Sequence, residues 1–466
     1  MLSGISRLRR HPIRAALWRL VPLGSAPGLV ALGLVGANLP DQASAQQPLN
    51  VPAATGYELK LPTFPTQPVE LFLNVSEGYD TNLFGTESAA EPGHPDFANI
   101  FSWTTIIGPK IAFDLLPLIS PDRGGFLKSL DVSYEGDESL FTGWSSEDNF
   151  RNILNTQVRG AGGPWTLLVD NTLVYVDGPT EDPYYSTYSP LGYREARDRR
   201  NQVDESNYST LRYDGEGWFA RAVAEAQYYN LLIDEHNPVG AYKGYLNWVN
   251  RDDINTGADF GIGLSKNFDF VAGWRIGQQT QARTYYSPGD SDNTYNRALF
   301  GFEGKLVPWL QLSLVAGPDW RRYGDGANSG VTGDRHTWLY TESSLTATLS
   351  PRDTLTFSNK VWHWVSASGV SSYQETTSAW NYRHAFTASF SGSVGLVVQG
   401  VRYDTPNVRN DWATSYPIDL TYSFTRSVSL SFDCVDNRGR SKIPVAVDPG
   451  RDWDQRQVFL SLRIAH

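Results

Sequence analysis

The chain has 466 residues, a formal net charge of -11, 40% hydrophobic residues and 13% aromatic residues. Its mean hydropathy of -0.37 excludes a bundle of membrane helices, and its acidic balance argues against nucleic acid as a partner. Because Cys434 is the single cysteine, no intramolecular disulfide can form. The many Gly, Tyr and Trp residues instead favour an all-β protein rich in interfacial aromatics.

Residues 1–45 have the features of a secretory signal peptide. Arginines precede an apolar run over 20–37, and Ala43-Ser44-Ala45 supplies the small residues of a cleavage site. An uncleaved membrane anchor is the alternative, but prolines interrupt the run and shorten it. Residues 46–68 then form a Pro-rich tether on the periplasmic side of a barrel that spans 69–466.

Apolar and polar residues alternate in one stretch after another from Val69 onwards, which predicts β-strands with one apolar face. The clearest case is 294–323, where the Val307-Pro308 turn joins two alternating strands into a hairpin. The other strands are expected near 69–79, 101–113, 130–135, 153–159, 165–176, 206–213, 218–229, 254–264, 268–283, 338–349, 354–365, 379–390, 394–403, 412–424, 428–435 and 458–464. This pattern predicts about 18 strands, with 16 as a possible count. A soluble sandwich would show the same alternation.

The connections separate a membrane barrel from a sandwich. Links after even-numbered strands are short, as at 266–267 and 350–353, whereas links after odd-numbered strands are long and polar; 115–125 is the exception. Outer-membrane barrels of Gram-negative bacteria place short turns in the periplasm and long loops outside. We therefore expect a single up-and-down antiparallel transmembrane β-barrel.

The apolar row of such a barrel must face lipid, so the polar row lines the lumen. Aromatic girdle residues are expected near the strand ends at Trp103, Trp218, Trp274, Trp309, Trp338, Tyr416 and Tyr422. The candidate pore-lining residues are Lys110, Glu135, Arg221, Glu225, Asp259, Arg275, Arg297, Glu303, Lys305, Arg321 and Arg383. Both signs of charge occur, which fits either a channel field that orients solutes or salt bridges that stiffen the wall.

The link over 178–201 is the longest in the chain and a candidate constriction loop. Its candidate residues are Glu181, Asp182, Arg194, Arg197 and Arg199. A loop of this length is usually functional or disordered. Folded inward, it would set a transverse field across the lumen; the alternative is a mobile extracellular flap.

Motifs for catalysis, phosphate binding and metal binding are missing from the sequence. The histidines have no metal-like spacing, and His384 lies on the outward row, where an interfacial role is expected. Asp448, Asp452 and Asp454 lack the spacing of a calcium loop. We therefore expect neither a cofactor nor a metal, and no enzymatic activity.

The first strand runs into Tyr79-Asp80-Thr81-Asn82-Leu83-Phe84, which resembles the opening of outer-membrane proteins of the β-barrel porin 2 type. Some members of that family accompany exopolysaccharide export. Members usually end in an aromatic residue, whereas this chain ends in His466. The resemblance implies an outer-membrane barrel.

The expected function is a porin-like channel for passive or weakly selective passage of small hydrophilic solutes. The alternatives are a barrel component of exopolysaccharide export and, less favoured, an outer-membrane lipid-modifying enzyme. Expected partners are outer-membrane lipids and lipopolysaccharide, the barrel assembly machinery and small polar solutes, with a homotrimer as a possible assembly.

Overall fold

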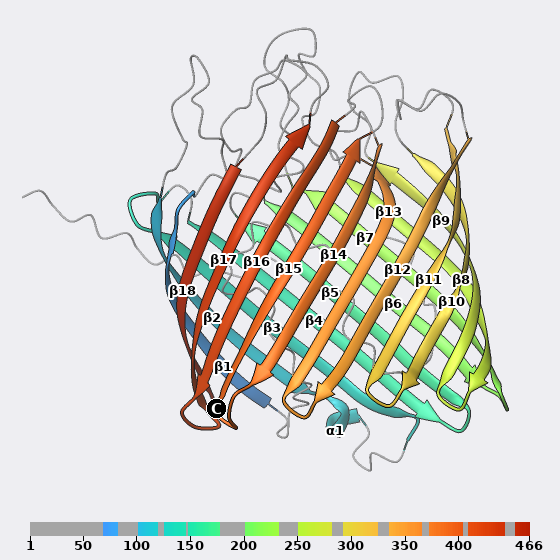
Figure 1. Cartoon of the computed structure of the whole chain (residues 1–466), viewed down its shortest axis with the longest axis horizontal. Coiled ribbons are helices and arrows are strands. Elements are labelled where there is room, and N and C mark those ends of the chain that lie inside the picture. The colour runs from blue at the N-terminus through green and yellow to red at the C-terminus, as the bar shows by residue number, and fades with distance from the viewer. Residues whose placement is uncertain are drawn as a thin grey trace, which may run out of the picture. The chain divides into compact units, whose positions relative to one another are not determined.

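A computed structural model describes residues 69–82, 101–119, 125–145, 148–177, 201–232, 250–281, 292–324, 335–365, 372–403, 409–442 and 453–466. The expected signal peptide, tether and constriction loop lie outside these ranges. Within them the chain is almost entirely β-strand (Figure 1).

The described residues form 18 strands. The first nine are β1 (Val69–Asp80), β2 (Ser102–Asp114), β3 (Leu127–Phe141), β4 (Asn149–Gly162), β5 (Trp165–Asp177), β6 (Gln202–Asp214), β7 (Trp218–Leu231), β8 (Arg251–Ser265) and β9 (Phe268–Gln281). The others are β10 (Asn293–Val307), β11 (Leu310–Tyr323), β12 (Arg335–Ser350), β13 (Asp353–Val365), β14 (Ser372–Ala385), β15 (Phe390–Tyr403), β16 (Arg409–Ser423), β17 (Val428–Lys442) and β18 (Trp453–Ala465).

Each strand pairs antiparallel with its neighbours in sequence, and β1 also pairs with β18. The sheet is therefore a closed up-and-down barrel of 18 strands, which confirms the predicted fold class and strand count. Closure leaves no strand at a free edge of the sheet.

The two ends of the barrel differ in their connections. The links after even-numbered strands, such as 163–164, 266–267 and 308–309, form what we call the turn end, at the bottom of Figure 1. Gly163 and Gly217 adopt positive φ angles of 59° and 75° in these turns, a conformation that glycine reaches without steric cost. The opposite end, where the links are longer, is the loop end.

Two turn-end links differ from the simple pattern. The link after β2 contains the short helix α1 (Leu116–Ile119), which explains the long connection seen in the sequence. The turn predicted at 391–393 lies at 386–389, because Phe386 stacks on Phe390 and Thr387 N–H donates to the carbonyl of Phe390. No helix within the described residues is long and apolar enough to cross a membrane.

The seam between β1 and β18 is fastened by the polar residues of the sequence that resembles the porin 2 opening. Gln455 and Gln457 each donate from Nε2 to Oδ2 of Asp80 over 2.9 Å. The backbone N–H of Asn82 donates to Oδ1 of the same carboxylate, and Asn82 Nδ2 donates to the carbonyl of Asp454. At the loop end, these contacts join the first strand to the last.

Candidate functional site

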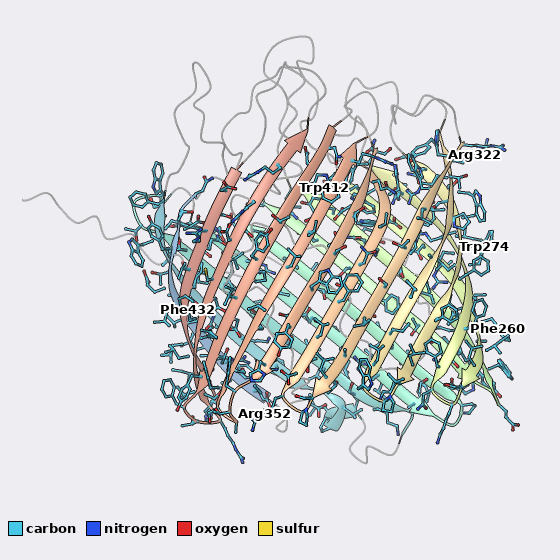
Figure 2. The ribbon with its side chains drawn as sticks, in the orientation of Figure 1. Phe260, Trp274, Arg322, Arg352, Trp412 and Phe432 are labelled. Carbon is cyan, nitrogen blue, oxygen red and sulfur yellow. The ribbon has the colours of Figure 1, made fainter. Side chains whose placement is uncertain are left out.

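The alternating side chains give the barrel an apolar outer face and a polar inner face. Phe260, Trp274 and Phe432 are among the exposed large apolar side chains, and Figure 2 shows Phe260 and Trp274 projecting from the outside of the sheet. Buried polar residues occupy the opposite row on the same strands. Hydrogen bonds between strands that are not neighbours, such as Arg251 on β8 to Tyr373 on β14, run through the interior.

A continuous chain of ion pairs covers the inner face from β6 to β10. Arg221 on β7 bonds to Asp259 on β8 over 2.9 Å, and Arg275 on β9 reaches the same carboxylate over 2.6 Å. Arg221 also pairs with Glu303 on β10 over 2.9 Å, and Arg212 on β6 approaches Glu303 within 3.3 Å. The arginines thus bridge strands that the backbone ladder does not join directly.

A second group lies on β10 and β11. Asp319 accepts from Arg297 over 2.9 Å and from Arg321 over 3.0 Å, and all three side chains are almost completely buried. The Arg297 guanidinium lies 3.7 Å from the centre of the Tyr340 ring, and Arg321 lies 4.8 Å from the centre of Tyr295. Charge pairing and cation–π contacts together hold both guanidinium groups.

Glycines on the inner row make room for these side chains. A Cβ at Gly273 would lie 2.1 Å from Oδ1 of Asp259, and one at Gly277 would lie 2.4 Å from the ring of Tyr295. The carboxylate and the phenol ring therefore lie flat over positions without a side chain. These two positions thus leave space on the inner face for the Asp259 carboxylate and the Tyr295 ring.

The other side of the lumen is formed by the loop ends of β13 and β14. Residues 362–365 of β13 and 372–375 of β14, here called the strap, stay paired with each other, from Trp362↔Glu375 to Val365↔Ser372. Trp362, His363 and Trp364 are consecutive and all buried. Since successive residues of a strand point to opposite faces, both faces of the strap are covered.

The strap is covered because it separates from β12 and folds inward, while residues 373–375 stay paired with β15. The His363 ring stacks on Trp338 of β12 with ring centroids 4.4 Å apart, and Tyr323 Oη lies 3.4 Å from His363 Nδ1. Gln279 on β9 donates to the carbonyl of His363 over 2.9 Å, and Arg251 on β8 donates to Tyr373 Oη over 3.2 Å. The strap therefore contacts the wall of β8 to β12 and narrows the lumen at the loop end.

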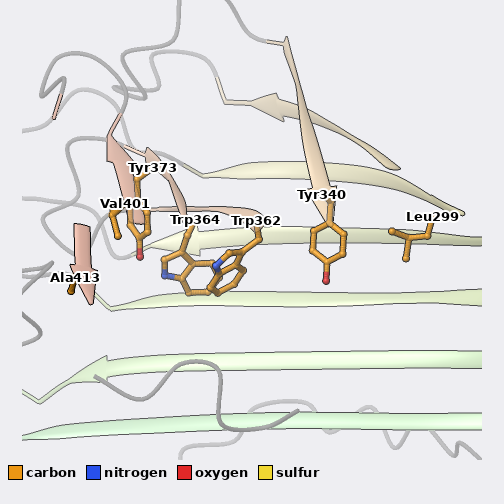
Figure 3. Packing of buried hydrophobic residues seen from close by; sticks show 7 residues of the cluster. All are labelled: Leu299, Tyr340, Trp362, Trp364, Tyr373, Val401 and Ala413. Carbon is orange, nitrogen blue, oxygen red and sulfur yellow. The ribbon is translucent and has the colours of Figure 1, made fainter. Parts of the chain in front are cut away.

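Apolar side chains gather where the strap meets the inner wall. The buried cluster consists of Leu299, Tyr340, Trp362, Trp364, Tyr373, Val401 and Ala413 (Figure 3). The rings of Trp362 and Trp364 stack with centroids 4.9 Å apart, and Lys360 Nζ lies 4.9 Å from the centre of the Trp362 ring. Part of the interior is thus a packed apolar core, where the sequence pattern had predicted a polar lining throughout.

The structure places the predicted pore-lining residues in three surroundings. Arg221, Glu225, Asp259, Arg275, Arg297, Glu303 and Arg321 belong to the inner wall, where Glu225 accepts from Asn255 over 2.9 Å. Lys110 and Glu135 form a separate pair 3.2 Å apart on β2 and β3. Lys305 is exposed beside the turn end, and Arg383 Nη2 lies 3.5 Å from Ser391 Oγ. That these residues line an open pore stays a prediction.

The girdle prediction is wrong for Trp338. It shares the inward row of β12 with Tyr340, because its ring packs on the strap instead of facing outward. Trp103, Trp218, Trp274, Trp309, Tyr416 and Tyr422 are exposed, as expected.

Residues Glu181, Asp182, Arg194, Arg197 and Arg199 lie outside the described ranges, so the structure does not describe the proposed constriction loop. The strap narrows the lumen instead, and the composition of one row of side chains is a sign of it. Trp338, Trp362 and Trp364 occupy a row on which other strands carry charged residues.

Other candidate sites are accounted for by local contacts. His384 Nδ1 lies 2.7 Å from Asp353 Oδ1 beside the turn end. Asp454 pairs with Arg440 over 2.7 Å. No group of His, Cys, Asp and Glu within the described residues is arranged to hold a metal ion.

Comparisons with known proteins give no family assignment. No protein-family model and no curated protein matches the chain. Among solved structures, the outer membrane protein OpdK of Pseudomonas aeruginosa matches with 10% identity, a TM-score of 0.37, and coverage of 85% of this chain and 99% of that chain. The FrpB iron transporter of Neisseria meningitidis matches with 8% identity, a TM-score of 0.42, and coverage of 86% and 81%. These likenesses are too low to inform function, which must be inferred from the geometry.

Proposed function

We propose that the protein is an outer-membrane channel that passes small hydrophilic solutes with weak charge selectivity. The observation that carries this proposal is the closed 18-stranded sheet with an apolar outer row and a polar inner row. In a bilayer, closure pairs every strand with a neighbour on each side, and the apolar outer row faces lipid. A barrel of this strand number encloses an aqueous passage unless other elements fill it.

The pairing of charges supports weak selectivity. Arg212, Arg221, Arg275, Arg297 and Arg321 each lie within ion-pair distance of a carboxylate. Charges that are paired with the opposite sign leave a smaller net field in the lumen than a ring of one sign would. Small solutes of either charge should therefore pass.

Planar lipid bilayers provide the test. Purified protein should give discrete conductance steps, and a salt gradient should give a reversal potential close to zero. Membranes that contain the folded protein yet show no steps, with no swelling of sugar-loaded proteoliposomes, would reject the channel. A reversal potential close to the equilibrium potential of the cation or of the anion would reject weak selectivity.

Sidedness requires its own test. We propose that the turn end faces the periplasm and that residues 1–45 and 46–68 are signal peptide and tether. In a Cys434→Ser background, cysteines placed at 327–332 should react with an impermeant label on intact cells, and cysteines at 351–352 should not. The reverse labelling pattern would show that the turn end faces the outside of the cell.

Ser350, Asp353 and His384, which lie together near the turn end, do not support a lipid-modifying enzyme. Asp353 accepts from both Ser350 and His384, so the carboxylate separates the hydroxyl from the imidazole. A histidine that cannot reach the hydroxyl cannot activate it as a nucleophile.

An export role remains a proposal that rests on the resemblance to the porin 2 type. Asp80 and Asn82, which carry that resemblance, fasten β1 to β18 and so have a structural use in any barrel. We likewise propose, as partners to be tested, lipopolysaccharide, the assembly machinery and a homotrimer.

A further inference from the structure

The wall of the barrel has one seam at which pairing stops well below the loop end, among the strands that the structure describes. β12 pairs with β11 over its whole loop half, up to Arg322↔Arg335. β13 pairs with β14 as far as Val365↔Ser372. Between β12 and β13, however, the ladder ends at Thr341↔Val361. Residues 335–340 and 362–365 therefore diverge, although both are strand.

The two strands diverge because the strap folds inward. Above Val361, β13 turns into the lumen, and its His363 carbonyl accepts from Gln279 of β9. In the order of the sheet, β10, β11 and β12 lie between these two strands. The segment has exchanged pairing with its neighbour for contacts with the inner face of more distant strands.

The residues of β12 and β13 above this point could also pair with each other. Continued upwards, the register of Thr341↔Val361 would place Tyr340 opposite Trp362 and Trp338 opposite Trp364. Both pairs would lie on the inner face, and cross-strand aromatic pairs stabilise antiparallel sheets. Leu339 and His363 would then be opposite each other on the outer face. A β12–β13 ladder of full length is therefore a second arrangement that these residues support.

We propose that the strap is a gate in the wall of the barrel. In the position seen here it narrows the lumen, and in the other position residues 362–365 pair with residues 337–340 of β12 and the lumen widens. This inference rests on the proposed channel function, because a gate needs a passage to control.

Hydrogen bonds and aromatic contacts are available to the strap in both positions, as a two-state element requires. The inward position is held by the Gln279 and Arg251 hydrogen bonds and by the stack of His363 on Trp338. The paired position would replace them with backbone hydrogen bonds and aromatic pairs. The ion pairs of Arg221, Arg275, Arg297 and Arg321 involve no residue of the strap.

A reversible crosslink can trap the paired position. In a Cys434→Ser background, Leu339→Cys together with His363→Cys places two thiols opposite each other only when β13 pairs with β12. Oxidation should form the disulfide and increase the single-channel conductance, and reduction should restore the initial value. Because oxidised and reduced forms of one protein are compared, effects of the substitutions themselves cancel.

A matched control lies lower on the same two strands. Leu345 and Phe357 already pair in the ladder, so Leu345→Cys with Phe357→Cys should crosslink without changing conductance. A control pair that crosslinks while the 339/363 pair does not would overturn the gate. So would a 339/363 crosslink that leaves conductance unchanged in a protein that conducts.

Failure of the channel is distinguishable from failure of the gate. A barrel that never conducts, oxidised or reduced, but forms the 339/363 crosslink would reject the channel and support the movement of the strap. The gel shift of the crosslink is measured without conductance, so each proposal has its own readout.

Discussion

Two groups of one aspartate and two arginines have the same geometry on opposite faces of the barrel. On the inner face, Asp319 bonds to Arg321 two residues along β11 and to Arg297 directly opposite on β10. On the outer face, Asp436 bonds to Arg438 two residues along β17 and to Arg456 directly opposite on β18. The N–O distances are 2.9 and 3.0 Å inside and 3.1 and 3.2 Å outside.

The two groups differ in burial. The side chain of Asp319 is 1% exposed and that of Asp436 is 23% exposed, and the arginines differ in the same sense. A buried carboxylate between two guanidinium groups cannot be removed without leaving charge in a medium of low dielectric. Asp436 lies directly opposite the girdle residue Tyr416, at the level where the membrane meets water, so water can replace its carboxylate. One aspartate and two arginines therefore stabilise the barrel strongly on the inner face, whereas the same three residue types contribute little to stability on the outer face.

The largest expected effect comes from removing the inner aspartate. Asp319→Ala leaves Arg297 and Arg321 buried without their shared acid and should lower the free energy of unfolding by about 3 to 5 kcal/mol. Urea unfolding of the barrel in detergent micelles or liposomes measures it. A loss as small as that of an exposed pair would show that water enters this part of the wall.

The comparison depends on which face meets lipid, and a substitution on the outer row tests that assignment. Leu314 is exposed on the outer face of β11, so Leu314→Arg places a charge in the hydrocarbon and should cost about 2 to 4 kcal/mol. Ser313→Arg, one residue away on the inner face, should cost much less. Unfolding in phospholipid vesicles measures both, and equal losses would reject the membrane assignment.

A smaller effect is expected at the seam that closes the barrel. Asp80→Ala removes the acceptor for Gln455 and Gln457, two buried donors, and should cost about 1 to 3 kcal/mol. The measurement is the temperature at which the folded band disappears from a gel, and this temperature should be lower for the variant. Unchanged resistance would mean that the backbone ladder alone holds β1 to β18.

The strands and their order could be predicted from the sequence because both depend on neighbouring residues. The alternation of Phe300 and Phe302 with Glu303 is local, and so is the short turn at 308–309. Register and closure then follow from joining each strand to the next. Strand ends were predicted too short in β3 and β4, since their outer residues pair through the backbone without a clear apolar row.

The inward fold of the strap could not be predicted in the same way. Trp362-His363-Trp364 continues the alternation of β13, so the local pattern indicates a strand that stays in the wall. The bend depends on Gln279 and Arg251, which are distant in sequence. The alternation alone fits both a solute field and a stiffened wall, and the distances show that Arg212, Arg221, Arg275, Arg297 and Arg321 are paired with carboxylates.

The smallest effect is expected at the outer group, and it differs in kind as well as in size. Asp436→Ala should change the free energy of unfolding by about 0 to 1 kcal/mol, because solvated guanidinium groups lose little when an exposed partner is removed. The remaining difference from wild type should shrink further when salt is raised from 0.1 to 1 M, an increase that shortens the screening length from about 10 to about 3 Å. The difference between Asp319→Ala and wild type should stay nearly constant over the same range, since ions do not reach a buried group. Urea titrations of both variants at the two salt concentrations measure this. A salt-sensitive loss at Asp319, or a large salt-insensitive loss at Asp436, would show that burial does not separate the two groups.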